Sequence, residues 1–301
     1  MVDKAKKTKK DDKTVGQLMI DAAFKVATDG KLQAMMLFVD SLDDIEQLGE
    51  LDYKGKFNII LVTRSEELSE KLQEYTSKVV LLSPVKMTRS GQMKMAVMIS
   101  FSKNYLKAAD RFIVLNGLAD GSLDTLMVVE VGREYEMFQT VDQGPLTEHI
   151  RRAVFERVLN LALELAAQGR EGKPIGAIFV VGDTANVSHN IRQMIMNPFK
   201  GHPVDKCNIL DDSMKETVKE FSTIDGAFII KGKGTIVSAG TYLLPRLVEE
   251  ELPQGLGARH AAAAAITAAT KSVAITISES TGTVRIWRQG KLITEIEKAK
   301  H

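Results

Sequence analysis

The sequence predicts an α/β protein with two domains, the first built on a parallel sheet and the second on a mixed sheet. Its 301 residues exceed the length that one hydrophobic core usually organises and suit two domains. In residues 14–141 short, uniformly apolar segments alternate with helical patterns, which is typical of parallel strands buried on both faces. In residues 145–301 a glycine-centred hairpin signal interrupts that alternation, so antiparallel strands are expected there as well.

The composition narrows the class of protein. Hydrophobic residues at 44% and charged residues at 26% are typical of a soluble globular chain. Forty basic against thirty-nine acidic side chains give a net charge of +1, which argues against a dedicated nucleic-acid or acidic-membrane surface. No apolar segment approaches the roughly 18 to 20 residues that span a bilayer. Cys207 is the single cysteine, which excludes an intrachain disulfide and a cysteine-based zinc site. We therefore expect a cytoplasmic protein with no membrane or nucleic-acid partner.

The first 13 residues are rich in lysine and no apolar core follows them, so they do not form a signal peptide. We expect a disordered, solvated basic tail, with an arm that contacts nucleic acid as the alternative.

The first domain is expected over residues 14–141. Leu18, Ala22, Val26 and nearby apolar residues suit one face of a first helix. Ser65 is placed to cap a helix after the second strand, with Glu66 and Glu67 in its first turn, where the helix dipole favours acids. The expected strands cover residues 34–39, 57–62, 79–82, 112–115 and 126–131, and a further helix covers residues 92–108.

In order and length of elements, this domain resembles the small α/β domain at the C-terminal end of pyruvate kinase. Ligands of such sheets bind beyond the carboxyl ends of the strands. No glycine fingerprint is present there, so the residues at those ends are interpreted as loop residues, with a regulatory ligand as the alternative. These residues are Asp40, Thr63, Arg64, Asn116 and Gly117.

The second domain is expected to begin after the Gly144-Pro145 pair, which breaks both helix and strand. A long amphipathic helix should follow, capped by Thr147 and ended by Gly169. Further helices are expected over residues 187–196, over 214–221 and in the alanine-rich segment after His260. The expected strands cover residues 175–181, a hairpin of 226–231 with 235–239, and the pair 273–277 and 283–287.

Asp225 is expected at the edge of a strand, with Gly226 beside it. A carboxylate there can hold a divalent metal and orient or deprotonate a sugar hydroxyl. The missing side chain of Gly226 would let a ligand lie against the backbone. Taken alone, Asp-Gly-Ala is also a common turn.

A second cluster opens the alanine-rich helix. Gly255 and Gly257 would expose backbone N–H groups at the positive end of that helix. Arg259 adds a fixed cationic fork suited to phosphate oxygens. His260 could donate to a leaving diphosphate or ligate a metal. The pattern predicts a site for a metal-bound polyphosphate, with an exposed glycine loop and helix cap as the alternative.

Six sequence blocks in order resemble the diadenylate cyclase domain, and the resemblance covers the chain from about Pro145 to its end. With the pyruvate-kinase-like domain ahead of it, the chain resembles the archaeal branch of that family. The blocks are Gly172-Lys-Pro-Ile-Gly-Ala-Ile-Phe-Val-Val-Gly-Asp183, Asn197-Pro-Phe199, Thr223-Ile-Asp-Gly-Ala-Phe-Ile-Ile230, Ala239-Gly-Thr-Tyr-Leu243, Gly255-Leu-Gly-Ala-Arg-His-Ala-Ala262 and Ile277-Ser-Glu-Ser-Thr-Gly282.

The resemblance implies roles for named residues. Asp225, Arg259 and His260 would be catalytic, and Asp225 would bind the metal, with His260 and Glu279 as the candidate further ligands. The usual bacterial block has threonine where Ala258 stands and a second arginine where Ala261 stands. Either Lys231, Lys233 or Arg246 compensates for these departures, or the activity is weak. The implied ATP-binding residues are Gly226, Ala227, Leu243, Leu256, Gly257, Ala258, Arg259 and His260.

The implied activity joins two ATP molecules into the second messenger cyclic di-AMP, with release of two diphosphates. Each 3′-hydroxyl would attack the α-phosphate of the other nucleotide where the cyclase domains of a homo-oligomer meet face to face. A divalent cofactor is expected, Mn²⁺ first, with Mg²⁺ or Co²⁺ as alternatives. The rival interpretation is a non-catalytic sensor of ATP or cyclic di-AMP with a degenerate pocket. A kinase-type ATPase is disfavoured because no G-x-x-x-x-G-K-[ST] sequence is present.

Overall fold

The computed structural model describes residues 13–42, 48, 58–107, 109–117, 122–130, 149–244 and 257–299. Contacts divide the chain into two compact units. The first comprises residues 1–63, 67–79 and 111–129, and the second residues 64–66, 80–110 and 130–301. Some predictions fall on residues outside the described ranges. Among them are the domain boundary at Gly144-Pro145, the predicted helix cap Thr147 and the predicted ATP-binding residue Leu256.

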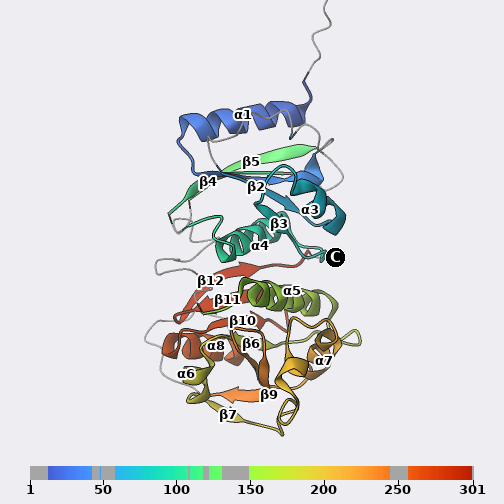
Figure 1. The fold of residues 1–301 in the computed structure, drawn as a ribbon, viewed down its shortest axis with the longest axis vertical. Helices are drawn as coiled ribbons and strands as arrows, with labels where there is room; N and C mark the ends of the chain where they lie inside the picture. The colour runs from blue at the N-terminus through green and yellow to red at the C-terminus, as the bar shows by residue number, and fades with distance from the viewer. Residues whose placement is uncertain are drawn as a thin grey trace, which may run out of the picture. The chain divides into compact units, whose positions relative to one another are not determined.

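The N-terminal sheet has five strands in the order β3-β2-β1-β4-β5 (Figure 1). The central strand β1 pairs in parallel with both β2 and β4, and all five of its residues are buried. Uniform burial is what the unbroken apolar segment predicted. The strands are β1 (Ala34–Phe38), β2 (Asn58–Thr63), β3 (Val79–Leu81), β4 (Arg111–Gly117) and β5 (Leu123–Glu130).

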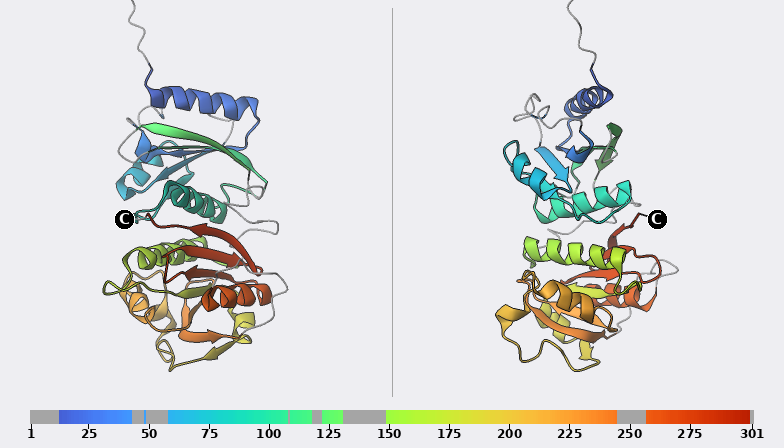
Figure 2. Two further views of the ribbon diagram at one scale, coloured as in Figure 1. Left: turned by 180° about the vertical axis from the view of Figure 1, so that it is seen from behind. Right: turned by 90° about the vertical axis from the view of Figure 1, so that its right-hand side faces the viewer.

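Helix α1 (Val15–Asp29) lies along the N-terminal sheet (Figure 2). Thr14 begins it with a capping box, in which its hydroxyl accepts from the backbone of Gln17 and the Gln17 side chain accepts from the backbone of Thr14. Its buried residues Ile20, Ala23 and Ala27 share one core with Met35, Leu37 and Leu115 of the sheet. The apolar face predicted for this helix is therefore wrong, because Leu18 and Val26 are 53% and 39% exposed. The short helix α3 (Glu66–Leu72) follows β2, as the Ser65 prediction requires.

The C-terminal sheet has seven strands in the order β12-β11-β10-β6-β8-β9-β7. Strands β6 and β8 are parallel, whereas the other described pairs are antiparallel. The predicted mixed sheet and its hairpin, β8 with β9, are confirmed. The strands are β6 (Ile178–Val181), β7 (Ile191–Gln193), β8 (Ala227–Ile230), β9 (Ile236–Leu243), β10 (Val273–Ile277), β11 (Val284–Arg288) and β12 (Lys291–Ile296).

Helices α5 (Arg152–Gln168) and α8 (Ala258–Ala269) both pack against strands β10 and β11 (Figure 1). Helix α5 begins at Arg152 with Arg151 at its N-cap, so the prediction that Thr147 caps it is wrong. As predicted, it ends at Gly169, whose φ of 63° needs glycine. Ala263 and Ala264 of α8 are buried in a hydrophobic core that includes Trp287 of the sheet. Their small side chains allow the helix to lie close to the sheet.

Two further elements differ from the predictions. The helix predicted over residues 187–196 is instead the short helix α6 (Thr184–Ser188) followed by strand β7. Strand β7 pairs with β9, and this long-range pairing outweighs the local helical pattern. Strand β12 was not predicted, because charged residues interrupt its apolar pattern.

Helix α4 (Arg89–Ser102) lies within the second unit, although its sequence precedes β4. It packs against α5 and β12. The Ser102 hydroxyl donates to Glu156 Oε1 of α5 over 3.2 Å, and the backbone of Ala299 donates to the carbonyl of Lys86 over 3.3 Å. Among the described residues, no helix combines the length and apolar character that a membrane crossing requires.

Candidate active site

Asp225 lies immediately before strand β8, after the turn that follows helix α7 (Met214–Phe221). Its side chain is 80% exposed. The neighbouring Gly226 has a φ of 114°, and a Cβ there would lie 2.7 Å from the backbone carbonyl carbon of Gly240 and the nitrogen of Thr241. The space beside Gly226 is therefore filled by strand β9, and glycine is required so that β9 can approach Asp225's strand.

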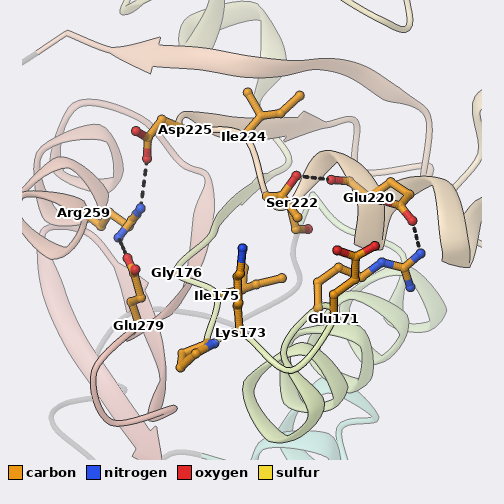
Figure 3. Close-up of a pocket in the computed structure, with 13 residues that line it drawn as sticks. Glu171, Lys173, Ile175, Gly176, Glu220, Ser222, Ile224, Asp225, Arg259 and Glu279 are labelled. Carbon is orange, nitrogen blue, oxygen red and sulfur yellow. Dashed lines mark hydrogen bonds and ion pairs between the residues drawn. The ribbon is translucent and has the colours of Figure 1, made fainter.

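Arg259 joins two acidic side chains at the start of helix α8. Its Nη2 donates to Asp225 Oδ1 and its Nη1 to Glu279 Oε2, each over 2.9 Å (Figure 3). Glu279 follows strand β10, so three segments far apart in the sequence meet at one guanidinium. Gly257 stands at the N-cap of α8 and, among the described residues, makes no side-chain hydrogen bond there; the N-terminus of a helix favours an anion.

Gly176, just before strand β6, lies close to the Arg259 side chain and leaves room for it. A Cβ at this position would lie 2.5 Å from Arg259 Nη1, 2.8 Å from its Cζ and 3.1 Å from Glu279 Cβ. Real contacts of that kind are not that short, so any larger residue would displace the guanidinium. Gly176 was quoted in the first sequence block, but nothing in the local pattern indicated that it borders Arg259.

Two clefts share one wall, which is formed by Arg259 and its two acidic partners, Asp225 and Glu279. The first has a volume of about 590 Å³ and extends from Arg259 toward Arg170, Lys173 and Glu220 (Figure 3). The second has a volume of about 750 Å³ and extends toward the start of α8 and the turn after β10. Both are lined by Pro174, Asp225, Arg259 and Glu279. The second is also lined by Gly257, Ala258, His260, Ile277, Ser278, Ser280, Thr281 and Arg285.

His260 is 6% exposed and held from the side of the sheet. Arg285 Nη1 on β11 lies 3.1 Å from His260 Nε2, and Arg285 Nε donates to Glu295 Oε2 on β12 over 3.0 Å. His260 Nδ1 is enclosed and has no hydrogen-bond partner among the described residues. Burial lowers the pKa of His260 to about 4, helped by the cations Arg285 and Arg259 and opposed by Glu295.

The depressed pKa of His260 predicts a loss of stability in acid. The unfolded chain takes up the proton as the pH falls through 6.5, whereas the folded protein resists until about 4. The His260 contribution is therefore complete above pH 6.5 and is lost progressively toward pH 4, by roughly 1–3 kcal/mol. Urea unfolding at pH 7 and pH 4.5 should show a smaller difference for His260→Gln than for the wild type. The exposed His202→Gln variant is the control, and an unchanged difference in His260→Gln would contradict the pKa assignment.

The structure does not bring all predicted site residues to the clefts. Asp225, Gly257, Ala258, Arg259, His260 and Glu279 line them, whereas Ala227 and Leu243 lie in the hydrophobic core. Lys231 and Lys233 follow strand β8, at the opposite end from Asp225, so they are badly placed to compensate for Ala258 and Ala261. Arg246 and Leu256 lie outside the described residues. Sequence reasoning missed Gly176, Arg285 and the hydroxyls of Ser278, Ser280 and Thr281.

Known families match both parts of the chain. Residues 164–292 match the family model described as DisA bacterial checkpoint controller nucleotide-binding. Residues 16–140 match the model described as Probable sensor domain DacZ_P.

Two curated relatives match most of the chain. A diadenylate cyclase of Methanocaldococcus jannaschii is 31% identical over 314 residues, covering 94% of this chain and 97% of that protein. A diadenylate cyclase of Haloferax volcanii is 32% identical over 271 residues, covering 88% and 93%. The solved structure of DacA from Staphylococcus aureus is 22% identical, with a TM-score of 0.31, and covers 48% of this chain and 87% of that one. The two full-length relatives confirm the predicted resemblance, and the chain belongs to the diadenylate cyclase family.

Proposed function

We propose that this protein joins two ATP molecules into cyclic di-AMP and releases two diphosphates. The observation that carries the proposal is the Arg259 guanidinium, held between Asp225 and Glu279 at the N-terminus of α8. A cation and a helix N-terminus suit a triphosphate, and an exposed carboxylate beside them suits the hydroxyl that must react. The curated relatives that match nearly the whole chain carry the name of this activity.

The chain's own residues would act mainly by position and charge. Backbone N–H groups at Gly257 and Ala258 and the Arg259 fork would bind the triphosphate of one ATP and counter the negative charge on its departing diphosphate. Asp225, 80% exposed and able to leave its ion pair, would orient the ribose 3′-hydroxyl. His260 would support the phosphate side of the same cleft, which it lines together with Arg285.

The reaction needs two reciprocal steps of the same kind. The 3′-oxygen of each nucleotide forms a bond to the α-phosphorus of the other, and the bond from that phosphorus to the bridging oxygen of the β-phosphate breaks. Each hydroxyl proton passes to solvent or to a nearby base, and each diphosphate keeps the electron pair. One pocket with one ATP cannot close the ring, so two cyclase units of a homo-oligomer would have to present their nucleotides face to face.

The donor set fits a divalent metal that arrives with the nucleotide. Among the described residues there is no cluster of three or more metal-ligating side chains. Asp225 and Glu279 nevertheless converge on one guanidinium, and one or two carboxylates plus substrate phosphates are the usual ligands of Mg²⁺-type ions. Asp225, with Glu279 as a second oxygen donor, would hold the ion. When bound, the metal would supply charge neutralisation and activate the hydroxyl; Mn²⁺ is the first choice to test, then Mg²⁺ and Co²⁺.

Incubation of the purified full chain with ATP and MnCl₂ tests the proposal. Chromatography should show cyclic di-AMP and diphosphate in a ratio of one to two. ADP and phosphate as the only products would overturn the activity. Retention of ATP or cyclic di-AMP in a binding assay, with no product under Mn²⁺, Mg²⁺ or Co²⁺, would favour the alternative of a sensor with a degenerate pocket.

A further inference from the structure

A chain of three polar side chains connects the edge of the C-terminal sheet to helix α8. Glu295 on β12 accepts from Arg285 Nε over 3.0 Å, and Arg285 Nη1 lies 3.1 Å from His260 Nε2. The Arg285 side chain is 14% exposed and that of Glu295 is 35% exposed. The three side chains are therefore connected by contacts of hydrogen-bond length, and Arg285 at their centre is largely buried.

The strand register holds Arg285 in this position. Arg285 lies directly opposite Thr276 of β10 and Glu295 of β12. Trp287, two residues further along β11, points to the same face of the sheet. Its indole donates to Thr276 Oγ1 over 3.0 Å, and its ring centroid lies 6.1 Å from that of His260. The strand pairing and the buried indole therefore hold the Arg285 side chain where it contacts Nε2 of His260.

The chemistry of the pair determines where the imidazole proton sits. A guanidinium has only donors, so Nε2 of His260 must be the acceptor in the contact with Arg285. The proton of the neutral ring then lies on Nδ1, which is enclosed without a partner among the described residues. Neither nitrogen offers a free lone pair in this arrangement, so His260 is badly placed to ligate a metal, the alternative that its position beside Arg259 had suggested.

Arg285 also brings a second guanidinium to a cleft where α8 supplies only one. Ala258 and Ala261 flank the Arg259-His260 pair on the helix, and Arg285 lines the same cleft as Ala258 and His260. The cation thus comes from strand β11 rather than from the helix. No recognisable motif surrounds Arg285 in the sequence, which is why only the structure reveals it.

We propose that Arg285, anchored by Glu295, is a positioning residue that holds His260 as the neutral ring with its proton on Nδ1. The consequence for catalysis rests on the proposed cyclase activity, but the tautomer does not. In this role Arg285 keeps Nε2 of His260 occupied, so the ring stays neutral and fixed in the wall of the cleft that it lines. Its removal should therefore alter both the ring and the turnover rate.

The test combines spectroscopy with kinetics on the full chain. Nitrogen-15 NMR of protein labelled at histidine, with His260 assigned by the His260→Gln variant, should show the Nδ1–H tautomer in the wild type. Arg285→Met should shift His260 toward a mixture of tautomers and lower kcat by about 10- to 100-fold, with a smaller change in KM, as expected for loss of a charged hydrogen bond. Arg285→Lys keeps a cationic donor and should restore the tautomer and part of the rate.

Two further variants separate this role from a structural one. Arg288→Met removes a cation from the same strand without touching either cleft, and should change neither the tautomer nor kcat. If Arg285→Met does not fold, as judged by circular dichroism, Glu295→Gln takes its place and should shift both readouts in the same direction by a smaller amount.

Each outcome decides one of the two proposals. An unchanged His260 tautomer in Arg285→Met or Glu295→Gln would overturn the positioning role. A changed tautomer with unchanged kcat would overturn its importance for catalysis. A wild-type protein that shows the Nδ1–H signal but makes no cyclic di-AMP would count against the proposed function alone.

Discussion

Replacement of Asp225 by asparagine should lower the turnover of ATP by at least about 100-fold while the fold is retained. Loss of an acid that orients or deprotonates a reacting hydroxyl typically has an effect of this size. The structural cost should be small, because the carboxylate is 80% exposed and its described contact is the ion pair with Arg259. Exposed ion pairs contribute little to stability. Rates of cyclic di-AMP formation and thermal unfolding of the variant provide the measurement.

A second exposed pair offers a matched control. Asp212 is 92% exposed and accepts from Arg157 over 2.7 Å, away from both clefts, so Asp212→Asn should leave the rate unchanged. Near-normal turnover by Asp225→Asn would contradict the catalytic role, and failure to fold would mean that Asp225 is structural.

The same variant tests the face-to-face contact. When Asp225→Asn chains are mixed with wild type and allowed to exchange, the rate should follow the square of the wild-type fraction. A linear response with verified mixing would show that each subunit completes the chemistry alone.

Gly176→Ala should also lower turnover strongly, by roughly 100-fold, although it adds only one methyl group. The new Cβ would lie 2.5 Å from Arg259 Nη1, and the flexible end of Arg259 is the group that can move away. The fold should therefore tolerate the change, whereas the ion pairs of Arg259 with Asp225 and Glu279 should not. A displacement of about 1 Å in a positioned group can cost that much in rate. Steady-state kinetics, with a rise in KM for ATP expected as well, provide the measurement.

Gly16→Ala is the comparison variant, since its nearest described contact to an added Cβ is 3.8 Å, to Thr14 Oγ1. It should match the wild type in rate and be at least as stable, because alanine favours a helix more than glycine does. If Gly176→Ala kept full activity, the position of Arg259 beside Gly176 would not be the one that matters for the reaction.

The parts of the fold that depend on local patterns were predictable from the sequence. Uniformly apolar segments predicted the parallel strands β1, β2 and β4, and the glycines after Lys231 predicted the β8–β9 hairpin. The segment of residues 187–196 was not predictable in this way. The first part of this segment does form a helix, α6. The rest forms strand β7 because it pairs with β9, a strand about 50 residues away in the sequence.

The candidate site was predictable only in its charged residues. Asp225 and Arg259 each have a local pattern that indicates phosphate or metal chemistry. Gly176, Arg285 and Glu295 act through neighbours that the sheet brings to them, and a single sequence does not show cross-strand registers. Gly226 has a packing reason that the sequence did not reveal, since an added Cβ would meet the backbone of strand β9; its predicted contact with a ligand stays a prediction.

Helix α4 has a consequence for how the cyclase part can be separated from the rest of the chain. Residues 89–102 belong to the stretch that matches the sensor family model, yet this helix packs against α5 and β12. Met93, Met95, Val97, Ile99 and Phe101 of α4 are buried. A gene fragment that starts at Pro145 would leave out this helix and expose the apolar surface that it covers. A transplantable catalytic module would therefore have to carry residues from both sides of β4 and β5, which makes the cyclase part difficult to exchange between proteins as one continuous piece.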